Sequence, residues 1–367
     1  MEKASNKNRI AIIEFMRFLF AAVVMLFHSS VLRQPEDIFI MPKGYIGVEF
    51  FFLLSGFLMA ESAVKRCIQN TNQPTNKAFP VGEETIHFIG QKIAKFYPYY
   101  CFAFVVTFLT YPNIFSGSKA DFLQRCEEAL WELLLVKRVG LGNEVWLNGA
   151  TWYLSAMVFC MLLIYPLMYK QRDIFVHIAA PILVIFILGI LYAEGGLSIT
   201  GEIFTQYYRS LLRAFAELSL GCICFEICCK LREKIPKSAV RISLTVFEIL
   251  CYLTALAFAA YWNGDMRMDY FILLVLAVGI TVSFSGLSYF SRIKAGVITT
   301  FLGKFSLCIY LNHRGWCWFL NAKIPGGGYK EKLPLYIGMT ICSSLVCMVT
   351  VDGIKYIWKS RQKGEQK

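Results

Sequence analysis

The sequence predicts an all-α integral membrane protein, a polytopic bundle of about ten transmembrane helices with both termini in the cytoplasm. Of its 367 residues, 57% are hydrophobic, whereas soluble domains average about 45–50% apolar residues. The mean hydropathy is +0.53. Ten apolar spans follow one another along the chain, and the loops between them alternate in their content of basic residues. These observations predict both the fold class and the orientation.

The ten spans form a single membrane domain, residues 1–367, with a core of about 10–358 and a basic cytoplasmic tail at 359–367. A helix needs roughly 20 apolar residues to cross a bilayer, and most of the spans are about that long. No loop is long enough to fold alone, although the outer segment 115–150 contains an amphipathic stretch at helical spacing, which suits the membrane interface. The spans are expected at about 10–31, 44–62, 96–114, 151–169, 174–193, 207–228, 241–262, 269–289, 297–320 and 334–357.

The loop charges predict the orientation. With the N-terminus inside, 22 of the 37 Lys and Arg residues fall in inner segments and 11 in outer segments. Cytoplasmic loops carry such an excess, so the net charge of +12 reflects topology rather than nucleic-acid binding. We expect a multi-pass protein of the cell (plasma) membrane. The 13 cysteines show no zinc-ligand spacing, so no metal site is expected.

Three ionisable residues lie in the first span, which reads IEFMRFLFAAVVMLFH from residue 13 to residue 28. Glu14 and Arg17 are close enough in a helix to pair. Arg17 and His28 are separated by about 1100° of helical rotation, so they share one face about 16 Å apart along the axis. Such a polar stripe inside a membrane faces a bundle interior or a wet cavity. His28 has no acidic neighbour in its own turn, and a neutral imidazole there is suited to accept or relay a proton.

Five stretches of the chain form a recognisable series of motifs. The first span contains E-x-x-R-x10-H, and the others are GYIGVEFFFLLSGFLM at 44–59, KIAKFYPYY at 92–100, TWYLSAM at 151–157 and LGKFSLCIYLNH at 302–313. In the same order, they resemble the motifs of the acyltransferase 3 family of membrane O-acyltransferases, in which the second motif is G-V-[DE]-x-F-F-x-x-S-G-F. No SGNH-type esterase domain follows the last span, so the stand-alone transmembrane form is expected.

The resemblance implies an O-acyltransferase whose co-substrate is cytoplasmic acyl-CoA, with acetyl-CoA expected and no bound cofactor. The acceptor is then a hydroxyl of a cell-surface polysaccharide or a lipid-linked glycan. Lys92, Lys95 and Tyr97 are the expected acyl-CoA-binding residues. The two lysines stand where the family often has Arg, and their alternative role is to anchor the cytoplasmic side of the helix.

For the reaction centre, the resemblance implies catalytic roles for His28, Arg17 and Glu14. His28 is expected to act as general base on the acceptor hydroxyl or to carry the acyl group itself. Arg17 either orients the donor or holds Glu14.

A second group of residues is expected around the acceptor. Glu49 is expected to orient His28 or the acceptor, or to be a structural carboxylate, and Arg213 and Glu217 form either a structural ion pair or part of the site. His313 closes a matched motif without an assigned role. The remaining members of this group are Trp152 and Tyr153, as a membrane-interface belt or a sugar platform.

The alternative function is a polytopic transporter or flippase of a glycan or small molecule, which would share the helix number and the buried charges. Transporters commonly have inverted repeats and paired broken helices. The sequence shows neither feature, which favours the enzyme.

Overall fold

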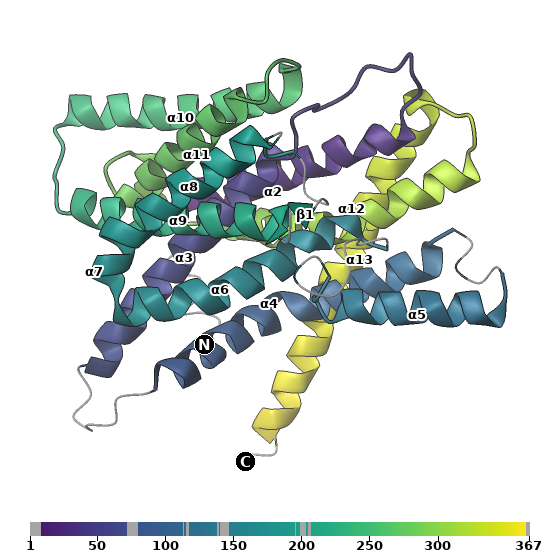
Figure 1. Ribbon diagram of the computed structural model, residues 1–367, viewed down its shortest axis with the longest axis horizontal. Coiled ribbons are helices and arrows are strands. Elements are labelled where there is room, and N and C mark those ends of the chain that lie inside the picture. The colour runs from purple at the N-terminus through teal and green to yellow at the C-terminus, as the bar shows by residue number, and fades with distance from the viewer. Residues whose placement is uncertain are drawn as a thin grey trace.

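The protein is helical throughout most of its length, as the sequence predicts (Figure 1). The computed structural model describes residues 9–71, 80–112, 114, 117–137, 139, 147–194, 196–198, 203–204 and 207–364. Within these residues the extended structure amounts to one short antiparallel pair, β1 (Ile203–Phe204) with β2 (Tyr207–Tyr208), and one isolated bridge between Ile10 and Lys294. The all-α class is therefore confirmed.

The helices vary widely in length. In chain order they are α2 (Ala11–His28), α3 (Ile46–Thr71), α4 (Val81–Thr110), α5 (Lys119–Leu133), α6 (Trp152–Lys170), α7 (Arg172–Ile174), α8 (Ala180–Ala193), α9 (Arg209–Arg232), α10 (Ser238–Tyr261), α11 (Met268–Ser285), α12 (Val297–Lys323) and α13 (Tyr329–Gly364). The shorter helical turns are η2 (Ser29–Leu32), η3 (Gly149–Thr151), η4 (Phe175–Ala179) and η5 (Phe290–Arg292). A π-helical turn, η4, joins α7 to α8, so these three segments form one continuous rod.

Eight helical stretches among the described residues are long and apolar enough to cross a membrane, which makes this a polytopic membrane protein. They correspond to eight of the ten expected spans. The other two expected spans form α9 and α12, helices of 24 and 27 residues with more polar side chains. Both pack against spanning helices: α9 against α3, α8, α6 and α11, and α12 against α2, α13 and α4. Ten crossings and cytoplasmic termini stay predictions.

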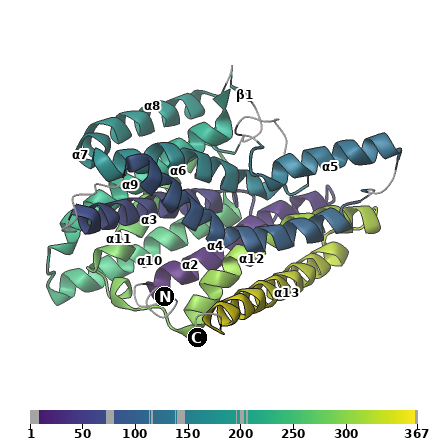
Figure 2. The same ribbon diagram turned by 90° about the horizontal axis from the view of Figure 1, so that it is seen from below.

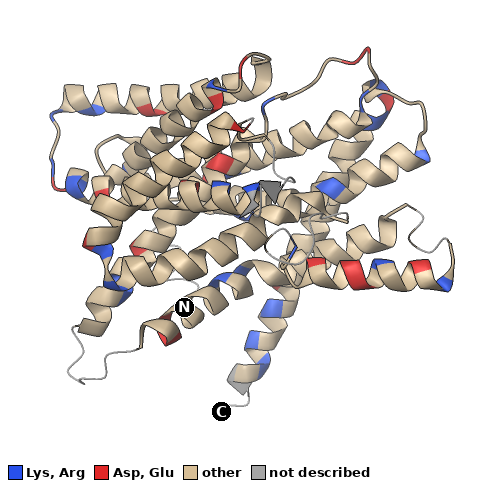
Figure 3. Ribbon diagram, in the orientation of Figure 1, with Lys and Arg blue, Asp and Glu red and all other residues tan. Residues whose placement is uncertain are grey.

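Some helices run well past their apolar spans. The helix α3 continues to Thr71, α4 begins at Val81 rather than near residue 96, and α13 covers Tyr329–Gly364. A 30-residue helix is about 45 Å long, against about 30 Å for the hydrocarbon core. The charged extensions carry no hydropathy signal, which explains the shorter expected spans. Figure 3 shows basic residues along the C-terminal end of α13.

The amphipathic stretch expected in the outer segment forms α5. A capping box between Ser118 and Asp121 begins it, and its charges of both signs are visible in Figure 3. Its last turn is held by α4, because the hydroxyls of Tyr100 and Tyr97 donate to the carbonyls of Glu132 (2.6 Å) and Leu133 (3.2 Å). Figure 2 shows α8 and α13 at opposite edges of the bundle.

Small residues bring two helix pairs into close contact. A Cβ added at Gly56 of α3 would overlap the backbone carbonyl of Leu218 in α9, and one at Gly221 would overlap that of Leu53. Glycines at such crossings let membrane helices approach closely. Likewise, Gly303 of α12 leaves room for the Glu14 side chain of α2. This second contact brings the two histidine-bearing helices together.

Candidate active site

The two histidines that the sequence singled out in separate motifs meet inside the bundle. His28 is the last residue of α2, and His313 lies in the middle of α12 with 0% of its side chain exposed. The Nε2 atom of His313 lies 3.0 Å from Nδ1 of His28, and the ring centroids are 5.0 Å apart. The two rings therefore form a hydrogen-bonded pair between helices that are far apart in sequence.

The backbone carbonyls around this pair determine the tautomers. The Nδ1 atom of His313 lies 3.2 Å from the carbonyl oxygen of Ile309, and a carbonyl only accepts, so this nitrogen carries the proton. In a neutral ring, Nε2 of His313 then accepts, and Nδ1 of His28 donates to it. The same Nδ1 lies 3.0 Å from the carbonyl oxygen of Val24, which again requires a proton there. The Nε2 lone pair of His28 is left to act as a base.

The end of α2 that carries His28 is held from several sides. The Cys317 thiol donates to the His28 carbonyl (3.3 Å), and the Tyr336 hydroxyl donates to the Met25 carbonyl (2.9 Å). The Ser29 and Tyr329 hydroxyls are 3.1 Å apart. Contacts from α12 and α13 therefore fix the backbone that carries the imidazole.

An exposed clasp lies on the same side of the molecule as this end of α2. The Asp37 carboxylate accepts hydrogen bonds from the backbone N–H groups of Gln34 and Tyr329, both at 2.9 Å. These bonds hold the pKa of Asp37 below its ordinary value, with the Gln34 bond contributing most. The clasp joins the loop after α2 to the first residue of α13.

Arg17 and Glu14 form the ion pair that their spacing predicts. The Nη1 atom of Arg17 donates to Glu14 at 3.0 Å, and Arg9 lies 3.8 Å from the same carboxylate oxygen. Arg17 also lies close enough to Lys92 of α4 to interact with it electrostatically, as does Lys95. Three cations from α2 and α4 therefore form one group.

This cationic group suits a polyanion. Neither Lys92 nor Lys95 has a carboxylate within 4 Å among the described residues, while Arg17 is bound by Glu14. Clustered positive charge attracts phosphate groups. Tyr97, expected to join the lysines, instead binds the end of α5 with its hydroxyl.

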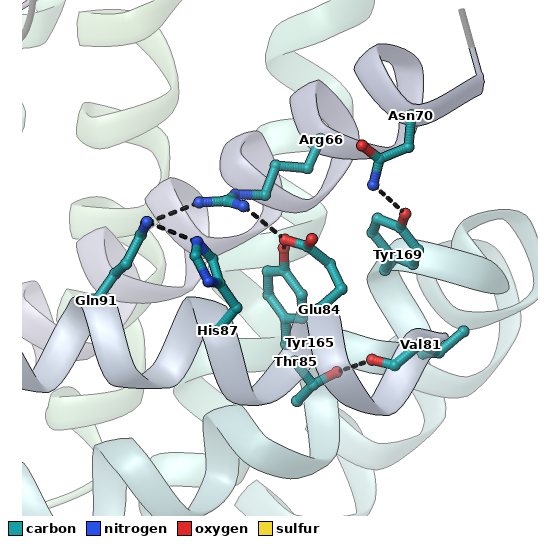
Figure 4. A network of polar contacts seen from close by, with 9 residues as sticks. All are labelled: Arg66, Asn70, Val81, Glu84, Thr85, His87, Gln91, Tyr165 and Tyr169. Carbon is teal, nitrogen blue, oxygen red and sulfur yellow. Dashed lines mark hydrogen bonds and ion pairs between the residues drawn. The ribbon is translucent and has the colours of Figure 1, made fainter. Parts of the chain in front are cut away.

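The N-terminal part of α4 is fixed by a polar network that sequence analysis did not predict (Figure 4). Arg66 of α3 donates to Glu84 (2.8 Å) and to Gln91 (2.7 Å) of α4. The Tyr165 hydroxyl of α6 also donates to Glu84, at 3.3 Å. Lys92 directly follows Gln91, so this network positions the start of the cationic group. Arg66 is one of the 22 basic residues of the expected inner segments.

Glu49, Arg213 and Glu217 form a fully buried cluster at 0%, 1% and 0% exposure. Arg213 binds Glu49 through Nη2 and donates through Nε to Glu217 at 3.3 Å. Its guanidinium lies 5.4 Å from the centroid of the Trp152 ring. Glu49 therefore belongs to this cluster, and it is His313 rather than Glu49 that hydrogen-bonds to His28.

The aromatic residues Trp152 and Tyr153 are buried, at 6% and 7% exposure, rather than displayed at the membrane surface. The Tyr153 hydroxyl lies 3.0 Å from the Ser55 hydroxyl, and its ring packs against Tyr310 at 5.8 Å. Tyr310 in turn packs against His313 at 5.9 Å. A series of ring contacts therefore runs from Tyr153 through Tyr310 to His313.

Comparison with known proteins agrees with the motifs. A family model described as an acyltransferase domain (Acyl_transf_3) matches residues 10–352, nearly the whole chain. No curated protein and no solved structure gave a significant match. The chain therefore belongs to the acyltransferase 3 family, and its helices make it a multi-pass membrane member.

No cluster of three or more His, Cys, Asp or Glu suited to a metal occurs within the described residues.

Proposed function

We propose that the protein transfers an acyl group, with acetyl as the expected group, from acyl-CoA to a hydroxyl of a cell-surface glycan or its lipid-linked precursor. The observation that carries this proposal is that Nδ1 of His28 faces both His313 and the Val24 carbonyl. In a neutral ring this assigns the proton to Nδ1 and leaves the lone pair of Nε2 as the base. Family membership supports acyl transfer as the class of reaction.

In the proposed reaction, His28 is the general base. Its Nε2 takes the proton of the acceptor hydroxyl while the oxygen forms a bond to the thioester carbonyl carbon. When the tetrahedral intermediate collapses, the carbon–sulfur bond breaks, and the CoA thiolate takes the proton back from the imidazolium. A proton donated and returned by one group is the usual pattern of general acid–base catalysis.

His313 is a positioning residue in this scheme. It holds the Nδ1–H tautomer of His28 and accepts a stronger hydrogen bond once His28 becomes cationic. The cations Arg17, Lys92 and Lys95 would bind the phosphates of CoA as they arrive from the cytoplasm. About 16 Å of helix separates Arg17 from His28, and the extended pantetheine arm of CoA would bridge that distance.

The test is acetyl-CoA turnover by the purified protein in detergent, measured as release of free CoA, together with glycan acylation in cells. His28→Ala should lower the rate by about 10²–10⁴-fold, the usual cost of losing a general base. The matched control is His177→Ala, because His177 is exposed and pairs with Asp173 at the surface. Undiminished turnover by His28→Ala would refute the proposal, and trapping of labelled acetyl on His28 would replace the general base with an acyl-histidine.

A further inference from the structure

Four Lys or Arg residues lie inside the ten expected spans and more than two residues from a span end. The structure pairs three of these four with carboxylates. These pairs are Arg17 with Glu14, Arg213 with Glu49 and Glu217, and Lys304 with Asp352. The fourth is Arg314, which follows His313 in α12. Among the described residues, no carboxylate lies within 4 Å of its guanidinium. Its Nε atom is buried without a hydrogen-bond partner.

The Arg314 guanidinium lies near the histidine pair, because Arg314 directly follows His313 in α12. It is close enough to His28 and His313 to interact with both electrostatically, and it also interacts with the Cys317 thiol, which donates to the His28 carbonyl. It packs 4.6 Å from the centroid of the Trp318 ring.

On another side of Arg314 is Gly149, the first residue of η3. A Cβ added there would lie 3.6 Å from the Arg314 Nε. The absence of a side chain at Gly149 leaves the edge of the guanidinium uncovered by this turn.

An unpaired cation in a membrane-embedded bundle is costly, and such residues are retained where an anion is bound or formed. Ring contact with Trp318 offsets only part of the cost. Acyl transfer creates an anion at this place, because attack on the thioester moves the carbonyl electron pair onto oxygen.

We propose that Arg314 is the oxyanion-stabilising residue: its guanidinium donates hydrogen bonds to the carbonyl oxygen of the acyl group as that oxygen becomes negative. This inference rests on the proposed function and assigns a second catalytic residue to the same site. The planar fork of Arg, which a lysine cannot reproduce, donates to one oxygen through two N–H groups. When the carbonyl re-forms, the negative charge leaves this oxygen and departs with the CoA thiolate.

The experiment measures CoA release from acetyl-CoA by wild type, Arg314→Gln and Arg314→Lys, with water alone and with methyl glucoside as a neutral acceptor. Loss of one oxyanion donor typically lowers kcat by about 10²–10³-fold. We expect that loss in Arg314→Gln for both acceptors, a smaller loss in Arg314→Lys, and unchanged binding of acetyl-CoA. The matched control is Lys323→Gln, which removes a cation that lies over Phe319 on the same helix.

The alternative roles of Arg314 predict different results. If it binds an acidic group of the acceptor, Arg314→Gln will hydrolyse acetyl-CoA as fast as wild type, which overturns the inference. If it only adjusts the basicity of His28, the variant will recover full activity at another pH, which also overturns it. If wild type releases no CoA, the proposed function itself fails, a result distinct from an active Arg314→Gln variant.

Discussion

Replacement of His313 tests the geometry of the histidine pair most directly. His313→Leu removes one of the two acceptors for the Nδ1 proton of His28, whereas His313→Gln offers an amide oxygen near the position of Nε2. We expect both proteins to insert and fold, because the ring of His313 contacts other side chains through packing that Leu and Gln can largely replace. Only the acceptor function separates the two variants.

The size of the effect follows from the contacts of His28. Its Nδ1 faces two acceptors at 3.0 Å, the Val24 carbonyl and His313. The tautomer therefore survives the loss of His313, and the cost is one hydrogen bond to a group that becomes charged in the transition state. Such a bond contributes about 1.5–3 kcal/mol, which corresponds to about 10- to 150-fold in kcat. This range ends near the lower limit of the loss expected for His28→Ala, about 10²–10⁴-fold.

The assay is steady-state CoA release at matched protein concentration, with elution from a sizing column as the check on folding. His313→Leu should lower kcat and leave the KM for acetyl-CoA unchanged, because the lost interaction strengthens only in the transition state. His313→Gln should recover most of the activity. A His313→Leu enzyme within twofold of wild type, or a Gln variant as slow as the Leu variant, would show that His313 is not the acceptor for His28.

Two further predictions concern the ends of the bundle. Replacing Lys92 and Lys95 with Glu should raise the KM for acetyl-CoA more than it lowers kcat, since phosphate contacts act in ground and transition states alike. The control is Lys234→Glu. An unchanged KM would mean that the two lysines only set the orientation of the helix in the membrane. The clasp made by Asp37 should be complete above about pH 4, the ordinary carboxyl range, and weaken as pH falls through its lowered pKa. Hydrogen exchange at Tyr329 should show this loss relative to Asp37→Asn, which lacks the pH dependence; equal behaviour of the two proteins at every pH would contradict it.

The helical bundle could be predicted from sequence because lipid leaves the backbone few options. Each peptide group within the hydrocarbon must be satisfied internally, so long apolar runs form helices. The shared face of Arg17 and His28 and the pairing of Arg17 with Glu14 likewise follow from helical periodicity alone. These are local properties, and they depend on no knowledge of which helices become neighbours.

The partner of His28 could not be predicted in this way. His313 is 285 residues away, and the contact depends on the packing of α2 against α12. Its motif marked His313 as notable, yet its chemistry becomes definable only when Nε2 is found against His28.

The position of Glu49 shows how helix packing decides between local alternatives. Glu49 lies seven residues before Gly56, about two helical turns, so the two residues share a face of α3. Gly56 is where α3 contacts α9. The face that carries Gly56 towards α9 therefore brings Glu49 to Arg213, and not to His28.

Whether Arg314 has a counterion likewise could not be predicted from the sequence. Four cations lie more than two residues inside the expected spans, and two of them, Arg17 and Arg213, have a carboxylate within one helical turn. The partners of Arg213 and Lys304 include residues 164 and 48 positions away, so no sequence pattern shows which cation lacks a counterion. Once those pairs are assigned, Arg314 is left without a carboxylate within 4 Å among the described residues, near the proposed base. The ion pairs thus neutralise Arg17, Arg213 and Lys304, whereas Arg314 remains open to the charge that acyl transfer would create.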